Sequence, residues 1–410
     1  MHSLVFPPDA NSNAYIFADL ARGLLSLGHE VIVLTTTPHY AIDEESLQRQ
    51  PMTSCHGRWL LKSDYHGIRC FHVAVPSRKG GIKTRITTAL RFHALGLIVM
   101  LSRKFKCEVV LSQSPPLTIG LVSAWIARWH GAKSVFIAQD IFPDGLVRQG
   151  KIRNPWFIKA LRTVEHLVYR QSDAICSISD GLVDVLRLRV PSRTLLRKIP
   201  NFVNTEIYRP LDRDNAFAKE RELGSQFVVS YVGNLGNAQD FTPVLAAAEV
   251  CSDLPIKFLI AGSGIKQEWL AQELAARKLD NVILLGYVPR DKTPLINAAS
   301  DICLVLLAPH ILNFSFPSKI YTIMACGKPT LLYGHTEADV ALFVEKESIG
   351  WVVRNGDIEG FVRMVRYLYH NRTELKVRGS RALACATSHF TEKAVALQYD
   401  ALIKELVTSR

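Results

Sequence analysis

Short apolar runs, many of them rich in β-branched residues, alternate with longer amphipathic segments along almost the whole chain. In the segment before Gly28, apolar residues recur at the spacing of one helix face, and glycine is often the residue just past a helix end. Short continuous apolar runs are typical of strands buried on both faces of a parallel sheet. The runs that we expect to form strands are residues 1–6, 31–34, 108–112, 133–138, 173–178, 227–232, 257–261, 281–285, 301–306 and 329–333. The alternation predicts parallel sheets covered by helices.

A turn-rich stretch over residues 198–210 interrupts this alternation and divides the chain. The 410 residues are more than one ordinary core needs and are enough for two α/β domains. We therefore predict two doubly wound, Rossmann-like domains, residues 1–204 and 205–388, followed by a largely helical terminal segment, 389–410. Ligands of such sheets bind beyond the carboxyl ends of the strands, so we expect both sets of strand ends to face one interdomain cleft.

The composition indicates the cellular compartment of the protein and the charge of its partner. The formal charge of +12 favours an anionic partner, which can be nucleic acid, anionic lipid or a phosphorylated substrate. The eight cysteines stand singly, without a C-x-x-C pair, as in a reduced cytoplasmic protein. No signal peptide is recognisable, and the longest apolar run, 94–101, is far shorter than the ~20 residues of a spanning helix. We expect a cytoplasmic protein that is soluble or lies on a membrane without crossing it.

Two glycine-rich loops follow consecutive strands of the predicted second domain. Gly233 and Gly236 come after the first of these strands, and Gly262 and Gly264 come after the next. Glycines at such places let the backbone approach a phosphate, which the N–H groups of the following helix can bind. A tight strand-to-helix turn explains either loop alone, but two such loops at neighbouring strand ends favour a nucleotide site.

The segment Pro317-Ser318-Lys319 is a second candidate for anion binding. Proline fits the first helical position or the turn before it, which places Lys319 in the first turn of a helix. A lysine is unfavourable for the helix dipole there, so its presence suggests a bound anion such as a diphosphate. The alternative is a lysine that only faces solvent.

Polar residues also follow an apolar strand of the predicted first domain. The run at 133–138 is followed by Gln139, Asp140 and Asp144, which we expect to face the cleft. The equal alternative is that a carboxylate here caps the next helix. Residues 212–214 have the D-x-D form of metal-dependent sugar transferases, but they lie in the connector beside a proline and we interpret them as a polar turn. No metal-binding or nucleophile-elbow motif occurs, so no metal site is predicted.

Taken in chain order, the motifs resemble those of a known family. Residues 22–31 resemble the L-x-x-x-G-H-E-V junction of GT-B glycosyltransferases, specifically retaining family 4, and residues 199–205 resemble the I-P-N-G-V-D linker of that family. Residues 231–236 resemble its Y-x-G-N-L-G loop, and residues 317–329 resemble its P-S-K and A-x-G-K-P donor segment. The resemblance covers nearly the whole chain and points to members that act on lipid-linked acceptors in exopolysaccharide or O-antigen synthesis.

The resemblance implies a nucleotide-sugar donor in the second domain, an acceptor in the first, and a terminal segment that crosses back to the first. Lys319 would stabilise charge on the leaving diphosphate, and Asp140 would be its catalytic counterpart on the acceptor side. The implied donor-binding residues are Gly233, Asn234, Gly236, Gly262, Gly264, Val288, Pro317, Ser318, Lys319, Tyr321 and Thr322. The implied acceptor-binding residues are Asp9, Asn13, Gln139, Asp140 and Asp144.

By the same resemblance, the activity is hexosyl or N-acetylhexosaminyl transfer with retention, from a UDP-linked donor to a lipid-linked or glycan acceptor, in bacterial envelope or exopolysaccharide synthesis. No metal or other cofactor is expected. The sequence also departs from the family: Phe314 and Thr322 replace paired glutamates that hold the sugar and the ribose, Gln139 replaces a histidine, and Asn234 and Gln239 lie near an expected Arg/Lys pair. A nucleotide-sugar epimerase or a catalytically degenerate protein of the same fold therefore stays open.

A basic cluster at residues 78–85 precedes the apolar stretch 89–101, with further lysines and arginines at 103–106. Basic residues beside an apolar helix face suit an anionic membrane surface, although a solvated helix face is the more common arrangement. A nucleic-acid-binding protein would carry aromatic residues among the basic ones, and this cluster contains none. We therefore predict peripheral contact with the inner face of an anionic membrane and no nucleic-acid partner.

Overall fold

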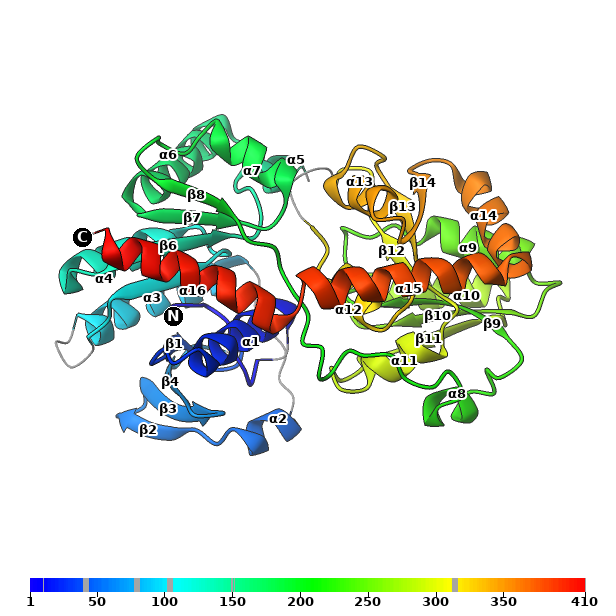
Figure 1. Ribbon diagram of the computed structural model, residues 1–410, viewed down its shortest axis with the longest axis horizontal. Coiled ribbons are helices and arrows are strands. Elements are labelled where there is room, and N and C mark those ends of the chain that lie inside the picture. The colour runs from blue at the N-terminus through cyan, green and yellow to red at the C-terminus, as the bar shows by residue number, and fades with distance from the viewer. Residues whose placement is uncertain are drawn as a thin grey trace. The chain divides into compact units, whose positions relative to one another are not determined.

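The computed structural model describes residues 1–9, 11–39, 44–76, 82–101, 106–148, 150, 152–311 and 316–409. The chain divides into two compact units, a first unit of residues 1–201 with 392–410 and a second unit of residues 202–391 (Figure 1). Each unit contains a largely parallel sheet with helices packed against it, which confirms the predicted α/β fold with two doubly wound domains.

The sheet of the first unit is assembled around the opening residues. Two four-stranded sheets, ordered β1-β4-β3-β2 and β5-β6-β7-β8, are joined by His2, which pairs in parallel with Leu34 of β1 and Ser112 of β5. The predicted strand over residues 1–6 is limited to this bridge. Directly after it, the Ser3 hydroxyl donates to the Val5 carbonyl (2.7 Å), a local hydrogen bond that replaces strand pairing. The strands are β1 (Ile32–Thr36), β2 (Thr53–His56), β3 (Leu60–Tyr65), β4 (Ile68–Val73), β5 (Val109–Gln113), β6 (Lys133–Ala138), β7 (Ala174–Ser177) and β8 (Leu195–Lys198).

Four of these strands, β2, β3, β4 and β8, are absent from the sequence prediction. The hairpin of β2 and β3 is antiparallel, with β2 fully exposed and β3 alternating between more and less buried positions. Residues of this kind lack the continuous apolar character that reveals a buried parallel strand. The prediction therefore found the strands of the sheet centre and missed those toward its edges.

The helices of the first unit form layers on its sheet. The terminal helix packs along α1, where a Cβ atom on Gly23 would lie 2.7 Å from that of Ala396, and His29 pairs with Asp400 (2.9 Å) (Figure 1). Gly28 adopts a positive φ of 91° just past α1, as the sequence predicts for a residue after a helix end. The helices are α1 (Ser12–Ser26), α2 (Glu44–Arg49), α3 (Ile82–Met100), α4 (Thr118–His130), α5 (Asp144–Arg148), α6 (Pro155–Gln171), α7 (Asp180–Arg187) and α16 (Glu392–Thr408).

The second unit has one six-stranded, fully parallel sheet in the order β11-β10-β9-β12-β13-β14. Its core is formed by aromatic and aliphatic side chains of β9, β10, β12 and β13 together with residues of α9 and α14. The strands are β9 (Phe227–Val232), β10 (Ile256–Ala261), β11 (Val282–Leu285), β12 (Ile302–Leu306), β13 (Thr330–Gly334) and β14 (Gly350–Arg354). The helices are α8 (Ala216–Glu220), α9 (Thr242–Val250), α10 (Gln267–Arg277), α11 (Thr293–Ala299), α12 (Lys319–Ala325), α13 (Asp339–Lys346), α14 (Ile358–His370) and α15 (Arg372–His389). All five strands predicted here are present to within one residue at each end, and β14 is additional.

Candidate functional site

The glycine loops after β9 and β10 lie directly against each other in the second unit. The Gly233 N–H donates to the Ala261 carbonyl (2.9 Å), which continues the pairing of the two strands. A Cβ atom on Gly262 would lie 1.8 Å from the Gly233 oxygen, and one on Gly264 would lie 2.4 Å from the Leu235 oxygen. The contact between the loops therefore already requires glycine at 262 and 264, independently of any ligand.

Gly233 has a second neighbour, the side chain of Lys319 at the start of α12. The Lys319 Nζ lies 3.0 Å from the position that a Cβ atom on Gly233 would occupy, and 3.4 Å from the centre of the Tyr231 ring. Tyr231 is buried on β9, and its hydroxyl donates to the Asn234 carbonyl (2.7 Å). Glycine at 233 thus leaves room for the amine, which lies against the aromatic ring.

The Lys319 amine is buried and has no hydrogen-bond partner among the residues that the structure describes. Burial lowers the pKa of Lys319 well below its ordinary value of 10.5, because the charged form loses its hydration. A cation–π contact contributes about 0.5–2 kcal/mol, which is less than the several kcal/mol needed to bury an ammonium ion. An anionic ligand would supply the partner that the described residues do not.

The position of Lys319 in the sheet also points to a ligand. The chain runs from β9 to β10 and β11 on one side of β9, and then crosses over to β12 on the other side. Ligands of doubly wound sheets bind at this switch point, beyond the carboxyl ends of the strands. Gly233 follows β9 and Lys319 follows the adjacent strand β12, so the two residues meet at the switch point of the second unit.

The other predicted donor-binding residues near this point differ in whether their polar groups are already hydrogen-bonded within the protein. The Gly236 N–H already donates to the Gln239 Oε1 (3.0 Å), whereas Asn234 is exposed. Ser318 is partly exposed at the N-cap of α12 and makes no side-chain capping hydrogen bond. The Thr322 hydroxyl donates to the Lys319 carbonyl (2.9 Å), so it can act toward a ligand only as an acceptor.

The remaining predicted donor-binding residues are described by their burial and their packing against other side chains. Tyr321 is buried, with its ring 5.7 Å from that of Phe316 and 5.0 Å from that of Phe390, and its contact with the donor stays a prediction. Pro317 is partly exposed beside Ser318, and partly buried Val288 packs against the cluster around Leu259. Phe314 lies outside the described residues.

Lys328, the lysine of the A-x-G-K-P part of the segment, also has a structural role. Its Nζ donates to the carbonyls of Ala298 (2.7 Å) and Ser300 (2.8 Å) at the end of α11. The two lysines of the segment therefore contrast: Lys328 is paired with backbone oxygens, whereas the Lys319 amine has no hydrogen-bond partner among the residues described.

In the first unit, Asp144 is part of an ion-pair cluster. It pairs with Arg162 (3.2 Å) and with Arg189, which also reaches Glu165 (3.1 Å). Glu165 is buried and accepts a hydrogen bond from Tyr169 (3.0 Å). Burial raises the pKa of Glu165, and the adjacent arginine partly offsets that rise. The Asp144 carboxylate is thus already paired with two arginines and holds α5 to α6 and to the residues after α7, and its contact with an acceptor stays a prediction.

Gln139 is likewise occupied within the fold. Its amide and that of Asn201 exchange two hydrogen bonds, from Gln139 Nε2 to Asn201 Oδ1 (3.1 Å) and from Asn201 Nδ2 to Gln139 Oε1 (2.8 Å). Both side chains are buried. Gln139 therefore fixes the end of β6 against the linker after β8, and its contact with an acceptor stays a prediction.

Asp140 and Asn13 are the predicted acceptor residues with accessible side chains. Asp140 follows Gln139 directly and is exposed, although surrounding protein desolvates its carboxylate and raises its pKa to about 6. Asn13 is partly exposed in the first turn of α1, and its backbone carbonyl accepts a hydrogen bond from Gln113 Nε2 (3.1 Å). These two remain candidates for contact with an acceptor.

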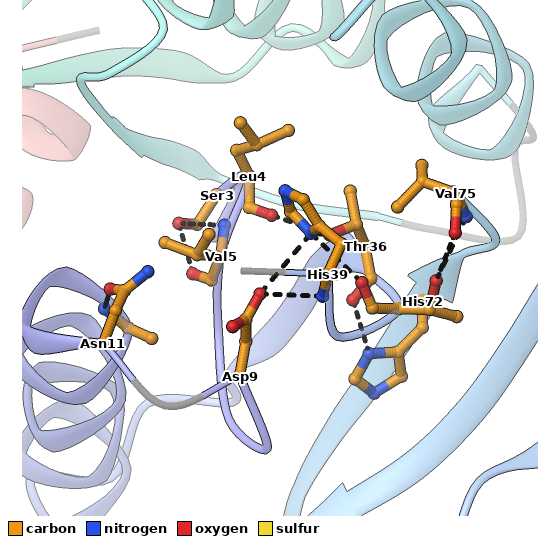
Figure 2. A network of polar contacts seen from close by, with 11 residues as sticks. Ser3, Leu4, Val5, Asp9, Asn11, Thr36, His39, His72 and Val75 are labelled. Atoms are coloured by element: carbon orange, nitrogen blue, oxygen red, sulfur yellow. Dashed lines mark hydrogen bonds and ion pairs between the residues drawn. The ribbon is translucent and has the colours of Figure 1, made fainter. Parts of the chain in front are cut away.

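Asp9 belongs to a buried network at the carboxyl end of β1 (Figure 2). Its Oδ2 accepts from the His39 N–H (3.1 Å) and lies 3.4 Å from His39 Nδ1. The same ring nitrogen is 3.0 Å from the Thr36 hydroxyl, which donates to the Leu4 carbonyl (2.8 Å). His39 is absent from the sequence prediction. Its position three residues after a buried strand could have indicated it, because polar residues that follow such strands often belong to a site. Asp9 thus shapes the strand end through His39.

The remaining predictions concern the membrane and metals. Residues 78–81 and 103–104 of the basic stretch lie outside the described residues. Within the described ranges, no helix is long and apolar enough to cross a membrane, and no three His, Cys, Asp or Glu residues are grouped as metal ligands. Arg213 of the D-x-D segment pairs with Asp301 (3.0 Å), in keeping with a structural turn.

Comparison with known proteins gives matches across both units. The glycosyl transferase 4-like domain model matches residues 13–201, and the glycosyl transferases group 1 model matches residues 212–382. The probable glycosyltransferase WbjE of Pseudomonas aeruginosa is 23% identical over 270 residues, 65% of this chain and 68% of that protein. The putative colanic acid biosynthesis glycosyl transferase WcaI of Escherichia coli K12 is 20% identical over 370 residues, 85% and 88% of the two chains.

Solved structures agree at the level of the fold. Sucrose-phosphate synthase from Thermosynechococcus elongatus has a TM-score of 0.76 at 14% identity, over 100% of this chain and 99% of that one. Anabaena HepE in complex with UDP-glucose has a TM-score of 0.73 at 15% identity, over 100% and 99%. The two family matches follow each other in chain order and together span most of the sequence. The chain therefore belongs to the group 1 glycosyltransferases and has the GT-B fold.

Proposed function

We propose that this glycosyltransferase transfers a hexosyl or N-acetylhexosaminyl group, with retention and without a metal, from a UDP-sugar to a lipid-linked or glycan acceptor. We place the reaction on the cytoplasmic face of a bacterial membrane, in envelope or exopolysaccharide synthesis. The name of WcaI, a putative colanic acid biosynthesis glycosyl transferase, supports polysaccharide synthesis by similarity, and the UDP-glucose bound to HepE supports a UDP-sugar donor.

The observation that carries the proposal is the buried amine of Lys319 beside Gly233, which finds no hydrogen-bond partner in the part of the chain that the structure describes. A nucleoside diphosphate leaving group gains negative charge as the glycosidic bond breaks. A cation fixed at that point stabilises the charge more in the transition state than in the ground state, which lowers the barrier. The diphosphate in turn restores a charged partner to the ammonium, so binding and protonation of Lys319 favour each other.

On the acceptor side, we assign to Asp140 the orientation of the acceptor hydroxyl. Asp140 follows the buried Gln139–Asn201 pair directly, and that pair holds the backbone of this strand end in place. With a pKa raised to about 6, Asp140 ionises close to neutral pH, and only above that value does it offer a charged carboxylate, which accepts a stronger hydrogen bond from the acceptor hydroxyl. A transfer rate that falls as the pH drops through about 6, and that loses this dependence in Asp140→Asn, would support the assignment.

The first test is ligand-induced stabilisation of the purified protein by UDP, GDP, ADP, TDP and CMP. A ligand at ~100 times its dissociation constant adds about 2.7 kcal/mol to the free energy of unfolding. We expect UDP to give the largest rise in Tm, Lys319→Met to abolish it, and Lys346→Met to preserve it, because Lys346 is an exposed lysine of the same unit. No rise with any nucleotide would argue for a degenerate donor site.

The second test is the reaction itself. Product anomers resolved by NMR distinguish retention from inversion, and rates with and without a chelator test metal independence. Donor that is isomerised in the absence of acceptor would replace the transferase with the epimerase alternative. Polyprenyl-phosphate-linked and free glycan acceptors, compared at equal concentration, would separate the two acceptor classes.

A further inference from the structure

The outer sides of α3, α4 and α6 carry large apolar residues where a solvent-facing helix normally carries polar ones. Trp125 and Trp129, one turn apart on α4, are 46% and 57% exposed. Leu90 and Ile98 on α3 are 62% and 61% exposed, and Trp156 at the start of α6 is 78% exposed. Single exposed apolar residues are common, but several on adjoining helices mark an interaction surface.

These helices are neighbours in one layer of the first unit. The Trp129 indole N–H donates to the Leu101 carbonyl at the end of α3 (3.1 Å), and Arg128 of α4 donates to Gln171 at the end of α6 (3.4 Å). The opposite side of α4, including Ile126, packs with Val110 of β5. The outer sides of α3 and α4 therefore face away from the sheet together.

The charge on this layer has one sign. The sequences of α3 and α4 contain no Asp or Glu, and the one acid of α6, Glu165, is buried and paired with Arg189. In contrast, α16 of the same unit carries acids and bases together. Besides Arg162, which pairs with Asp144, the exposed basic residues among the described side chains of the layer are Arg91, Arg128, Lys159 and Arg170.

We infer that this basic aromatic face, formed by Leu90, Ile98, Trp125, Trp129 and Trp156 with these four cations, binds the surface of an anionic bilayer. Tryptophan favours the headgroup level of a membrane, and each well-placed cation adds attraction to anionic lipid. A second copy of the chain fits less well, because a symmetric contact would bring the same acid-free basic faces together. The inference deepens the proposed function and rests on it for the identity of the acceptor that the membrane presents.

The test is sedimentation of the full chain with vesicles. We expect binding to vesicles of equal parts phosphatidylcholine and phosphatidylglycerol, weak binding to phosphatidylcholine alone, and a loss of binding at high salt. The double substitution Leu90→Gln/Trp125→Gln should lower the partition coefficient by at least about tenfold, since both side chains would otherwise bury apolar area in the interface. Both positions are already exposed, so the fold should tolerate the change.

A matched control is Leu342→Gln/Trp269→Gln, which alters one exposed leucine and one partly exposed tryptophan of the second unit. We expect this variant to bind vesicles like the unmodified protein. Equal binding by both double variants, or no preference of the unmodified protein for the anionic vesicles, would overturn the inference. A dimer in sedimentation velocity that Leu90→Gln/Trp125→Gln makes monomeric would assign the face to a second copy instead.

The Tm rise with UDP, measured on the same samples, separates this inference from the proposed function. Vesicle binding without a UDP response would leave the membrane face standing and overturn the donor assignment. A UDP response in Leu90→Gln/Trp125→Gln that equals that of the unmodified protein would show that the loss of membrane binding is not a loss of folding.

Discussion

Polar residues gather at the carboxyl ends of the strands in both units, but the two units use them differently. In the first unit, Asp9, Gln139 and Asp144 are buried and held by other groups of the same unit. In the second unit, the Lys319 amine is buried against an aromatic ring without a hydrogen-bond partner in the described residues. Because buried polar groups are nearly always paired, an unpaired one needs an explanation. A buried polar group without a hydrogen-bond partner therefore indicates a ligand contact better than its position at a strand end does.

The largest expected effect is on Lys319. Lys319→Met keeps the unbranched apolar part of the side chain and removes the charged amine, so we expect transfer to fall by roughly 10²–10³-fold, as for loss of one group that stabilises a developing anion. Without ligand, the same variant should be more stable by up to about 1–3 kcal/mol, because an unsatisfied buried group is gone. Initial rates and urea unfolding of the unliganded protein measure the two effects.

Lys346→Met serves as control for both measurements and should leave each unchanged, because Lys346 is exposed. If Lys319→Met lost stability and kept its transfer rate, the amine would be a structural group like that of Lys328, and the contrast between the two units would disappear.

The second prediction concerns the paired residues of the first unit. Arg189→Leu removes the cation shared by Asp144 and Glu165. Breaking a buried ion pair costs about 3–5 kcal/mol, and since Arg189 is partly exposed we expect a loss of about 2–3 kcal/mol in the free energy of unfolding. The rise in Tm with UDP should persist, because no part of this cluster belongs to the second unit.

Arg187→Leu is the matched control for Arg189→Leu. Arg187 lies two residues away and pairs with Asp184 (3.0 Å) on the surface, where such pairs contribute about 0.3–0.5 kcal/mol within a helix. Equal losses in the two variants, judged by urea midpoints, would mean that the cluster around Asp144 is no stronger than a surface pair, and that Asp144 is free to serve an acceptor.

The sequence predicts the sheet centres and the switch point of the second unit well, because continuous apolar runs and paired glycines have a direct physical meaning. It also predicts Lys319, since a lysine at a helix start opposes the dipole. It cannot predict how Gln139 and Asp144 are used, because their partners, Asn201 and Arg189, lie far along the chain. The environment of Tyr321 is unpredictable for a similar reason: its ring packs against Phe390, which follows α15, so its burial depends on a residue far along the chain.

The third prediction uses the lowered pKa of Lys319. Since burial lowers that pKa in the free protein and a bound diphosphate raises it, UDP binding should take up protons between the two values, and affinity should fall by at most about tenfold per pH unit there. Calorimetry in buffers of different ionisation enthalpy measures the uptake. It should be done well above pH ~6, where the terminal phosphate is already ionised. In the free protein, stability should rise with pH from the lowered pKa to 10.5, because the unfolded chain binds more protons. Equal proton uptake in Lys319→Met would assign it to another group.

The smallest effect is expected for the amide pair at the end of β6. Gln139→Leu and Asn201→Leu each leave one buried amide without its partner, and each should lower the free energy of unfolding by about 1–3 kcal/mol. The double variant should lose less than the sum, with a coupling of about 1 kcal/mol, because neither amide is then left unpaired. The transfer rates decide the role of Gln139. If it acts only through this pair, both single variants should transfer at equal rates per folded molecule, whereas a larger loss in Gln139→Leu would place its amide on the acceptor and make the first unit resemble the second.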